Sequence, residues 1–361
     1  MPRLCFKILP PIDRASESIS IHIDLDEPAG GISTRTLPLR WEEPFHVGEL
    51  DLEQNGELRF RIVRSNSSIP EVDACGNPIG DRVHEAWVDD TLEIVVADWK
   101  DRHAGQVERV SVPGQFFTDR ELVVWLPPSY FREELTQFPL IFGFDGGRLI
   151  DPLTSPAGID WGMDEWIRLL GCRGILPETI LVGLVARSGV SEDGVLLRDI
   201  ELSQEREGEM LSRYIVEEVV PFIDRRYRTI QKSSFRTIVG AGLGGVRAFW
   251  TALEYPAVFA NAACLSTSFE DISQAVPGCS RSLIGLEEGV FPPTDGRFYF
   301  DYGDVGLDEC YEIYHTILSS LLREKGWLAG KHMEIRRICA GAHDDLSWRH
   351  RIGGALQWLS S

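Results

Sequence analysis

The sequence predicts an α/β protein in two parts: a smaller all-β domain over residues 1–112 and an α/β domain over residues 113–361. Two observations support this division. Up to residue 112, short segments alternate apolar and polar residues, and no long helical period occurs. From residue 120 onward, apolar strand-like runs alternate with amphipathic helical segments, which is typical of a largely parallel sheet flanked by helices. A chain of 361 residues is also longer than one ordinary hydrophobic core requires.

The first domain is expected to be a β-sandwich of the carbohydrate-binding or immunoglobulin-like kind. Its predicted strands lie at residues 18–24, 58–63 and 91–97. Three tryptophans, Trp41, Trp87 and Trp99, are candidates for a platform on which a sugar stacks. Packing of these tryptophans in the sandwich core or between the domains is the alternative.

The second domain is expected to follow a linker at residues 106–113. Its predicted strands lie at residues 121–126, 139–144, 179–185, in the run before Gly240, and at 260–265, 298–301 and 333–339. Its predicted helices lie at residues 161–170, 209–227, 247–255, 310–325 and 348–359. Strands and helices in this alternation predict a mostly parallel sheet with helices on its faces.

The segment that organises the second domain is residues 235–250. A short β-branched run turns sharply through glycines and continues as an amphipathic helix. This is the context of a nucleophile elbow, in which G-x-S-x-G holds a serine on a strained turn. Here the motif is Gly240-x-Gly242-x-Gly244, so glycine occupies the nucleophile position.

The same glycines leave a second interpretation open. Gly240-x-Gly242-x-x-Gly245 satisfies the dinucleotide fingerprint G-x-G-x-x-G, and it follows a strand and opens a helix. A dinucleotide-binding oxidoreductase also requires an acidic residue at the end of the next strand, about 20 residues on. The next predicted strand ends in hydroxyl residues at 266–268 instead. The sequence therefore favours the elbow.

The later members of an acyl-transfer triad follow in the order that such a scaffold uses. His343 follows the last predicted strand and precedes the last helix, where a loop histidine belongs. The preceding strand is followed by Asp308, with Asp304 and Glu309 close by. Asp308 is expected to fix the tautomer of His343 and to stabilise the imidazolium. Capping of the following helix is the alternative role for Asp308.

An oxyanion hole is expected from two backbone N–H groups. Leu243 directly follows the nucleophile position and is expected to supply one of them. The other is expected from the loop after residues 139–144, at Asp145, Gly146 or Gly147. Glycines there permit close approach of a substrate to the backbone; a plain turn is the alternative.

On these residues, the segment from 120 to 361 resembles the enterochelin esterase-like (esterase D type) branch of the α/β-hydrolases, akin also to feruloyl esterases and mycolyltransferases. The matching stretches are residues 123–128, 138–140, 144–147, 198–202, 220–224, the elbow, 342–344 and Trp348. The family elbow reads Gly-x-Ser-Met-Gly-Gly, so the resemblance implies that Gly242 replaces the nucleophile, Asp308 matches the acid and His343 the base. The all-β segment is similar to the accessory domain of ferric-enterobactin esterases. The resemblance implies action on carboxylic esters without a cofactor or a metal.

Glycine has no side chain to attack a carbonyl, and loss of the nucleophile costs a serine hydrolase on the order of 10⁶ in kcat. Other candidate nucleophiles lie off the apex of the turn: Ser233, Ser234, Cys264, Ser266 and Ser268. Three functions stay open. The chain is a natural pseudo-esterase that binds a small ester-like ligand or a partner, or an esterase in which Gly242 is an inactivating substitution. In the third, His343 and Asp308 act as a general base without a covalent intermediate.

Composition limits the partners. A formal net charge of −20 argues against nucleic acid and anionic membrane surfaces. Seven cysteines without a C-x-x-C pair fit a reducing compartment, and the N-terminus lacks the apolar region of a signal peptide, so a cytoplasmic location is expected; a chain from which a signal had been removed would look the same. Arg148, Arg187 and Arg198 are candidates for a positive patch, with salt-bridged surface arginines as the alternative. The oligomeric state stays open.

Overall fold

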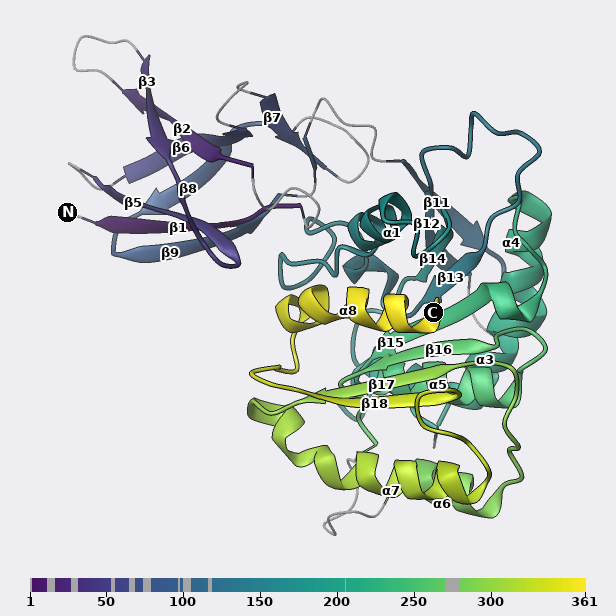
Figure 1. Ribbon diagram of the computed structural model, residues 1–361. Helices are drawn as coiled ribbons and strands as arrows, with labels where there is room; N and C mark the ends of the chain where they lie inside the picture. The colour runs from purple at the N-terminus through teal and green to yellow at the C-terminus, as the bar shows by residue number, and fades with distance from the viewer. Residues whose placement is uncertain are drawn as a thin grey trace.

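A computed structural model describes residues 2–11, 17–26, 32–52, 56–64, 69–73, 79–96, 98–99, 105–115, 119–204, 206–269 and 280–361. Two small sheets form before residue 100, and one eight-stranded sheet forms from residue 106 onward (Figure 1). The predicted fold class, an α/β part preceded by a smaller all-β part, is confirmed.

The all-β part consists of two sheets that share one core. Their orders are β4-β5-β1-β9 and β10-β7-β6-β2-β3, with β8 pairing with β6. The strands are β1 (Arg3–Leu9), β2 (Ile19–Asp26), β3 (Ile32–Pro38), β4 (Arg40–Glu42), β5 (Phe45–Asp51), β6 (Gly56–Arg64), β7 (Ile69–Val72), β8 (Arg82–Ala86), β9 (Asp90–Val95) and β10 (Asp98–Trp99). Phe6, Ile21 and Phe60 come from different strands and are buried in the same cluster. The predicted strands at 18–24 and 58–63 are therefore confirmed. The strand predicted at 91–97 corresponds to β9, which spans Asp90–Val95; residue 97 lies outside the described residues.

The three tryptophans do not form one platform. Trp99 is 1% exposed and belongs to the sandwich core. Trp41 on β4 is 44% exposed and packs on the ring of His46, with centroids 4.8 Å apart, whereas Trp87 follows β8 and is 61% exposed. The sugar-stacking expectation is wrong for Trp99, because its large apolar ring is needed between the sheets.

The eight-stranded sheet has the order β11-β12-β14-β13-β15-β16-β17-β18. Its strands are β11 (Gln106–Val112), β12 (Arg120–Leu126), β13 (Leu140–Gly143), β14 (Ile180–Leu184), β15 (Arg236–Ala241), β16 (Asn261–Leu265), β17 (Phe298–Gly303) and β18 (Met333–Ile338). β12 pairs antiparallel with β11 and β14, and all other pairs are parallel. The carboxyl ends of six neighbouring parallel strands, β13 to β18, therefore meet at one edge.

Helices cover both faces of this sheet (Figure 1). They are α1 (Met163–Cys172), α2 (Leu197–Leu202), α3 (Gly208–Tyr214), α4 (Val220–Arg226), α5 (Leu243–Glu254), α6 (Arg281–Glu288), α7 (Glu312–Glu324) and α8 (Asp345–Leu359), with short 3₁₀ turns η2 (Gly146–Arg148), η4 (Ser233–Phe235) and η5 (Gly306–Cys310). Ile167 of α1 and Ile352 of α8 pack on one face. Leu211 of α3, Phe249 of α5 and Leu318 of α7 pack on the other.

The expected linker at residues 106–113 is wrong. Residues 106–112 form β11, which pairs with β12 over seven positions. Val107 and Val110 pack against the hydrophobic clusters on opposite faces of the large sheet, which explains why this segment is a strand. The boundary at residue 112 therefore falls inside the sheet, and we propose a boundary before Gln106.

The single helix expected at residues 209–227 is interrupted. α3 is followed by a π-helical turn, η3 (Ile215–Val219), and then by α4. Pro221 lacks a backbone N–H and cannot donate the regular bond to the preceding turn, so the backbone widens there.

Candidate active site

The glycine turn forms the sharp connection between β15 and α5. Gly242 has φ 58° and ψ −125°, a conformation that costs a residue with a side chain about 1–3 kcal/mol. A Cβ at Gly240 would lie 2.2 Å from the carbonyl oxygen of Gly244, so the close crossing of strand and helix requires glycine at 240. The N–H of Gly242 donates to the carbonyl of Leu265 over 3.0 Å, which ties the turn to β16. The chain thus forms an elbow without a side chain at its apex.

The structure brings Asp308 and His343 together beside this turn. Asp308 lies on η5 and is completely buried, and His343 precedes α8. Nδ1 of His343 lies 2.8 Å from Oδ1 of Asp308. A Cβ placed on Gly242 would lie 3.0 Å from Nε2 and 3.2 Å from Cε1 of the same imidazole. The imidazole therefore faces the apex of the turn, while its far nitrogen is held by the carboxylate.

The second carboxylate oxygen of Asp308 is also satisfied. It accepts hydrogen bonds from the backbone N–H of Gly303 at 2.8 Å and from Oγ of Ser266 at 2.5 Å. Burial alone would raise the pKa of Asp308, but hydrogen bonds from His343, Ser266 and Gly303 outweigh burial and hold that pKa below its usual value. Asp308 is therefore an ionised carboxylate in a fixed orientation at neutral pH.

Ser266 is a residue whose position the sequence analysis did not foresee. It follows β16, is fully buried and has φ 40°. Its Oγ donates to Asp308 and accepts from Nε1 of Trp348 at 2.9 Å and from the guanidinium of Arg351. Its backbone N–H donates to Oδ1 of Asp301 at 2.9 Å. In the sequence, the one indication of this role was that Ser266 directly follows a predicted strand and so lies at the carboxyl edge of the sheet.

The expected oxyanion loop follows β13. Asp145 has φ 56°, and its carboxylate accepts from Nε and Nη2 of Arg198, both at 2.6 Å. A Cβ on Gly146 would lie 2.5 Å from the carbonyl oxygen of Gly183. The contact with β14 therefore requires glycine at position 146, whether or not a ligand approaches this loop.

The two predicted sources of oxyanion N–H groups lie on neighbouring segments. Leu243 is the first residue of α5, and a Cβ on the next residue, Gly244, would lie 3.5 Å from Oδ2 of Asp145. Gly147 follows within η2. The roles of Leu243, Asp145, Gly146 and Gly147 stay predictions.

Comparisons with known proteins identify the family of the α/β domain. The sequence model of the family described as "Putative esterase" matches residues 115–293, which include the elbow. The α/β domain belongs to this esterase family. Two relatives are both named as uncharacterized proteins of Bacillus subtilis (strain 168). YbbA is 25% identical over 185 residues, covering 47% of this chain and 70% of YbbA. YjcH is 28% identical over 152 residues, covering 39% of this chain and 52% of YjcH, so the match spans about half of that relative.

Solved structures share the fold of the esterase domain. Enterochelin esterase from Shigella flexneri has a TM-score of 0.54 at 14% identity, covering 95% of this chain and 87% of that one. Ferric enterobactin esterase from Salmonella typhimurium has a TM-score of 0.55 at 13% identity, covering 95% and 88%. A serine-to-alanine mutant of the feruloyl esterase module of Clostridium thermocellum, complexed with sinapinate, has a TM-score of 0.53 at 13% identity, covering 71% and 88%. The predicted α/β-hydrolase fold, with an all-β part ahead of it, is confirmed.

The other hydroxyl and thiol groups considered as nucleophiles in the sequence, all among the described residues, lie away from the elbow or have other partners. Ser233 and Ser234 lie on η4, which precedes β15 and so lies at the other end of that strand from Gly242. Cys264 is buried inside β16, and burial raises the pKa of its thiol. Ser268 accepts a hydrogen bond from the hydroxyl of Tyr311 at 3.0 Å. The Oγ of Ser266 is directed to Asp308 rather than to Nε2 of the imidazole.

The esterase domain also offers little support for dinucleotide binding. β16 ends at Leu265, and the next residue uses its hydroxyl on Asp308. The glycine at 245 packs against the strands: a Cβ there would lie 3.2 Å from the carbonyl oxygen of Leu265. These glycines serve the strand–helix crossing, and no acidic residue ends the following strand.

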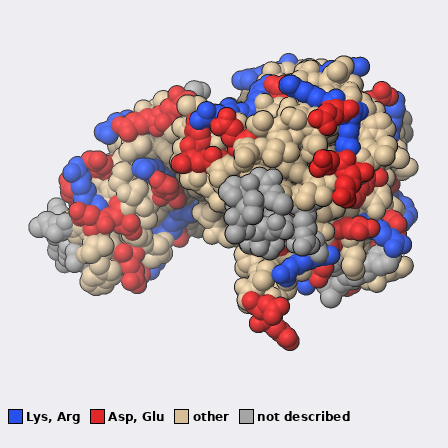
Figure 2. Space-filling view, turned by 90° about the horizontal axis from the view of Figure 1, so that it is seen from below, with Lys and Arg blue, Asp and Glu red and all other residues tan. Residues whose placement is uncertain are grey.

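The three candidate arginines of a positive patch are each paired with a carboxylate. Nη1 of Arg148 lies 2.6 Å from Asp345, Arg187 contacts Glu207, and Arg198 holds Asp145. In the face shown by Figure 2, acidic and basic side chains are interspersed. The salt-bridged alternative is therefore the correct one for these arginines, and they offer no unpaired positive charge for an anionic ligand.

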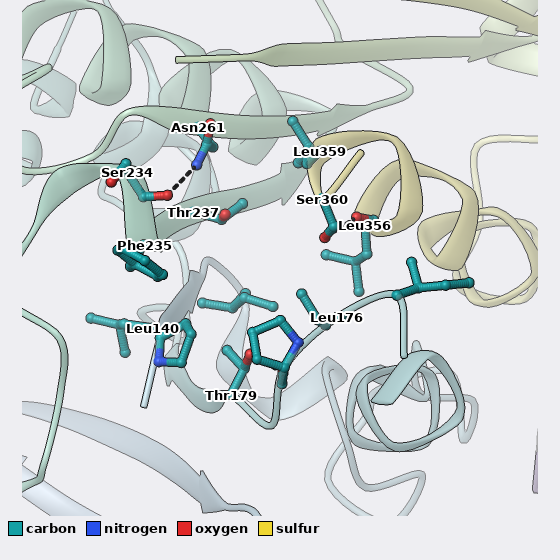
Figure 3. A pocket seen from close by; sticks show the side chains of 14 residues that line it. Leu140, Leu176, Thr179, Ser234, Phe235, Thr237, Asn261, Leu356, Leu359 and Ser360 are labelled. Atoms are coloured by element: carbon teal, nitrogen blue, oxygen red, sulfur yellow. Dashed lines mark hydrogen bonds between the residues drawn. The ribbon is translucent and has the colours of Figure 1, made fainter. Parts of the chain in front are cut away.

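A pocket of about 240 Å³ lies at the amino ends of the strands, away from the elbow (Figure 3). Leu140, Leu176, Phe235 and Leu356 supply its apolar walls. Asn261 donates to the carbonyl of Ser234 at its rim, over 3.2 Å. The carboxyl ends of the same strands carry the candidate active site, so this pocket is separate from it.

Among the described residues, no helix is both long and apolar enough to cross a membrane.

Asp301, next to the site, leads to a prediction about pH. Burial raises its pKa to about 6, against the opposing effect of Arg351. A carboxyl with a raised folded-state pKa stabilises the fold fully below its unfolded pKa of about 3.9, and this stability is lost as the pH rises through about 6. Between pH 4 and pH 7, we expect the free energy of unfolding of the wild type to fall by about 2 kcal/mol relative to Asp301→Asn. Urea denaturation at several pH values measures this.

The control is Asp295→Asn, at an exposed aspartate ahead of β17. It is expected to keep the pH dependence of the wild type. Parallel curves for the wild type and Asp301→Asn would contradict the prediction.

Proposed function

We propose that the esterase domain binds a small carboxylic ester or carboxylic acid without covalent attachment, and that it does not turn over esters as a serine hydrolase. The observation that carries this is Gly242 at the apex of the elbow, with Nε2 of His343 only 3.0 Å from where its Cβ would be. The base is present and the group that it would activate is not.

The site keeps what recognises a carbonyl compound. Asp308 orients His343, so Nε2 is available to accept a hydrogen bond from a ligand. The N–H groups of Leu243 and of residues 145–147 are proposed to bind the carbonyl oxygen. Hydrolysis would require an attacking hydroxyl, and its absence costs on the order of 10⁶ in kcat.

Small aromatic acids are the ligand class that we test first. The related feruloyl esterase fold holds sinapinate in a serine-to-alanine mutant. In the present chain the paired arginines provide no free cation, which favours a ligand of low charge over a highly anionic one. A neutral ester or a monocarboxylic acid fits this site best.

The experiment combines binding and turnover. Calorimetry is expected to show reversible binding of sinapinate to the full chain and weaker binding to His343→Ala. Mass spectrometry after incubation with p-nitrophenyl acetate is expected to show no acylated protein. Hydrolysis of this ester by the unaltered chain that is abolished in His343→Ala would overturn the proposal, as would binding that does not depend on His343.

We also propose a cytoplasmic location for the protein. No disulfide joins the cysteines of the described residues, at positions 5, 172, 264, 310 and 339, which fits a reducing compartment. Fractionation of the source cells with an antibody against the chain tests this, and recovery from an extracytoplasmic fraction would contradict it.

A further inference from the structure

The orientation of His343 makes Nε2 a base without a protein partner. Its Nδ1 faces the ionised carboxylate of Asp308 at 2.8 Å, so Nδ1 carries the proton and donates it. In the neutral ring the lone pair is then on Nε2, which faces Gly242. Among the described residues, the structure gives Nε2 no hydrogen-bond donor. In an esterase with a serine elbow, the hydroxyl would take this position.

The ring is held in place by its neighbours. Trp348 and Tyr311 meet it edge to face, with centroids 5.1 Å and 5.8 Å from the imidazole centroid. Each of these aromatic side chains is itself tied by a hydrogen bond, Trp348 to Ser266 at 2.9 Å and Tyr311 to Ser268 at 3.0 Å. The side chain of His343 keeps 22% of its surface exposed, so a ligand can reach it. The base is thus oriented in advance and accessible.

A hydrogen-bond donor for developing negative charge directly follows the glycine that faces this base. Leu243 is the first residue of α5, a helix of 12 residues, and its N–H belongs to the positive end of the helix dipole. In acyl transfer such a donor stabilises a tetrahedral oxyanion. An enolate also carries negative charge on its oxygen, so the same donor stabilises an enolate as well.

We propose that His343 abstracts a proton from the carbon next to the carbonyl of a bound ligand. This rests on the proposed function only in placing a carbonyl compound at the elbow. The C–H bond breaks and its proton passes to Nε2. The electron pair of that bond forms a C=C bond, and the carbonyl oxygen becomes an enolate oxygen that accepts from the N–H of Leu243. Return of a proton from Nε2 regenerates the ligand, so the activity is an enolisation that needs no second reactant.

Ethyl pyruvate in D₂O tests enolisation and ester hydrolysis in one sample. Proton NMR follows deuterium entering its keto methyl group, and it separately follows release of ethanol. The unaltered chain is expected to catalyse exchange without releasing ethanol. His343→Ala is expected to lose about 100-fold or more of the exchange rate, the range of a general base. An exchange rate in the wild type equal to that of His343→Ala would overturn the inference.

Two further variants keep the test independent of folding. Asp308→Asn presents an amide N–H to Nδ1, moves the proton to Nε2 and removes the base; we expect at least a tenfold loss of exchange. Unchanged exchange in Asp308→Asn would contradict the role of the tautomer. His22→Ala, on β2 of the all-β part, is the matched histidine control and is expected to exchange like the wild type. Circular dichroism confirms that each variant is folded.

Serine at the elbow distinguishes this inference from the proposed function. In Gly242→Ser the new hydroxyl donates a hydrogen bond to Nε2, so Nε2 no longer takes a proton from the ligand. We therefore expect deuterium exchange to fall while ethanol release appears. If Gly242→Ser releases ethanol but the wild type does not exchange, the enolising activity is wrong and the proposed function stands. If neither protein acts on the probe and sinapinate does not bind, both are wrong.

Discussion

Gly242→Ser is expected to hydrolyse short p-nitrophenyl esters at a rate on the order of 10³-fold above the unaltered chain. The new Oγ completes a nucleophile–base–acid series with His343 and Asp308, whose Nδ1–Oδ1 distance is already 2.8 Å. This rate gain is smaller than the factor of about 10⁶ in kcat that a nucleophile supplies in a serine hydrolase. The reason is that a Cβ on residue 242 would lie 3.0 Å from Nε2, so the imidazole must shift away from it. Trp348 and Tyr311 oppose that movement. Initial rates of p-nitrophenol release measure the effect.

Gly242→Ala is the matched control, since it adds the same Cβ without a hydroxyl. It is expected to show no gain in hydrolysis. Both variants place a side chain at φ 58°, so both are expected to melt at a lower temperature than the wild type, with a cost of about 1–3 kcal/mol. A gain in Gly242→Ala would show that another group attacks the ester. An equal or higher melting temperature in Gly242→Ser would contradict the view that glycine relieves strain.

Arg349→Met is expected to lower the free energy of unfolding by about 3–5 kcal/mol. Arg349 on α8 is fully buried, and its guanidinium lies 2.8 Å from Asp160 and 2.7 Å from Glu165. Asp164 belongs to the same acidic cluster, whose ligand atoms lie within 4.8 Å of one another. Although this cluster has the composition of a cation site, two of its carboxylates bind the guanidinium. Without Arg349, buried carboxylates remain without their counter-charge.

Urea denaturation at pH 7 measures this loss. Arg213→Met removes an exposed guanidinium from its pair with Glu217, 2.9 Å away and one helical turn on, and is expected to cost several-fold less. Burial raises the pKa of Asp160, so acidification is expected to return part of the stability of Arg349→Met by protonating it. Equal losses in the two variants would contradict the importance of the buried pair.

Features with a local or periodic signal could be predicted from the sequence alone. The isoleucines at 19, 21 and 23 alternate along one strand, and all three are buried because one face of β2 points into the sandwich. The glycine turn between β15 and α5 was predictable from its spacing. His343 and Asp308 were predictable because parallel strands bring the loops at their carboxyl ends to one edge.

Other features depend on contacts between distant segments. Ser266 is one of these, since its hydroxyl is shared by groups that are 42, 82 and 85 residues away along the chain. The pairing of Arg148 with Asp345 crosses 197 residues, and it decides that this arginine is not a free positive charge. Residues 106–112 form β11 of the large sheet because they pair antiparallel with β12. The composition and the local pattern of a sequence do not predict which distant residues pair after folding.

The sequence by itself determined the fold class, the esterase resemblance and the absence of a nucleophile at Gly242, because strand and helix periods and the elbow spacing are properties of neighbouring residues. The tertiary structure alone decided how the site is completed. It directs Ser266 to Asp308 rather than to the imidazole, and it leaves Nε2 of His343 facing the bare turn. Those outcomes depend on where a side chain points after folding, and hydrogen bonds between distant segments determine that direction.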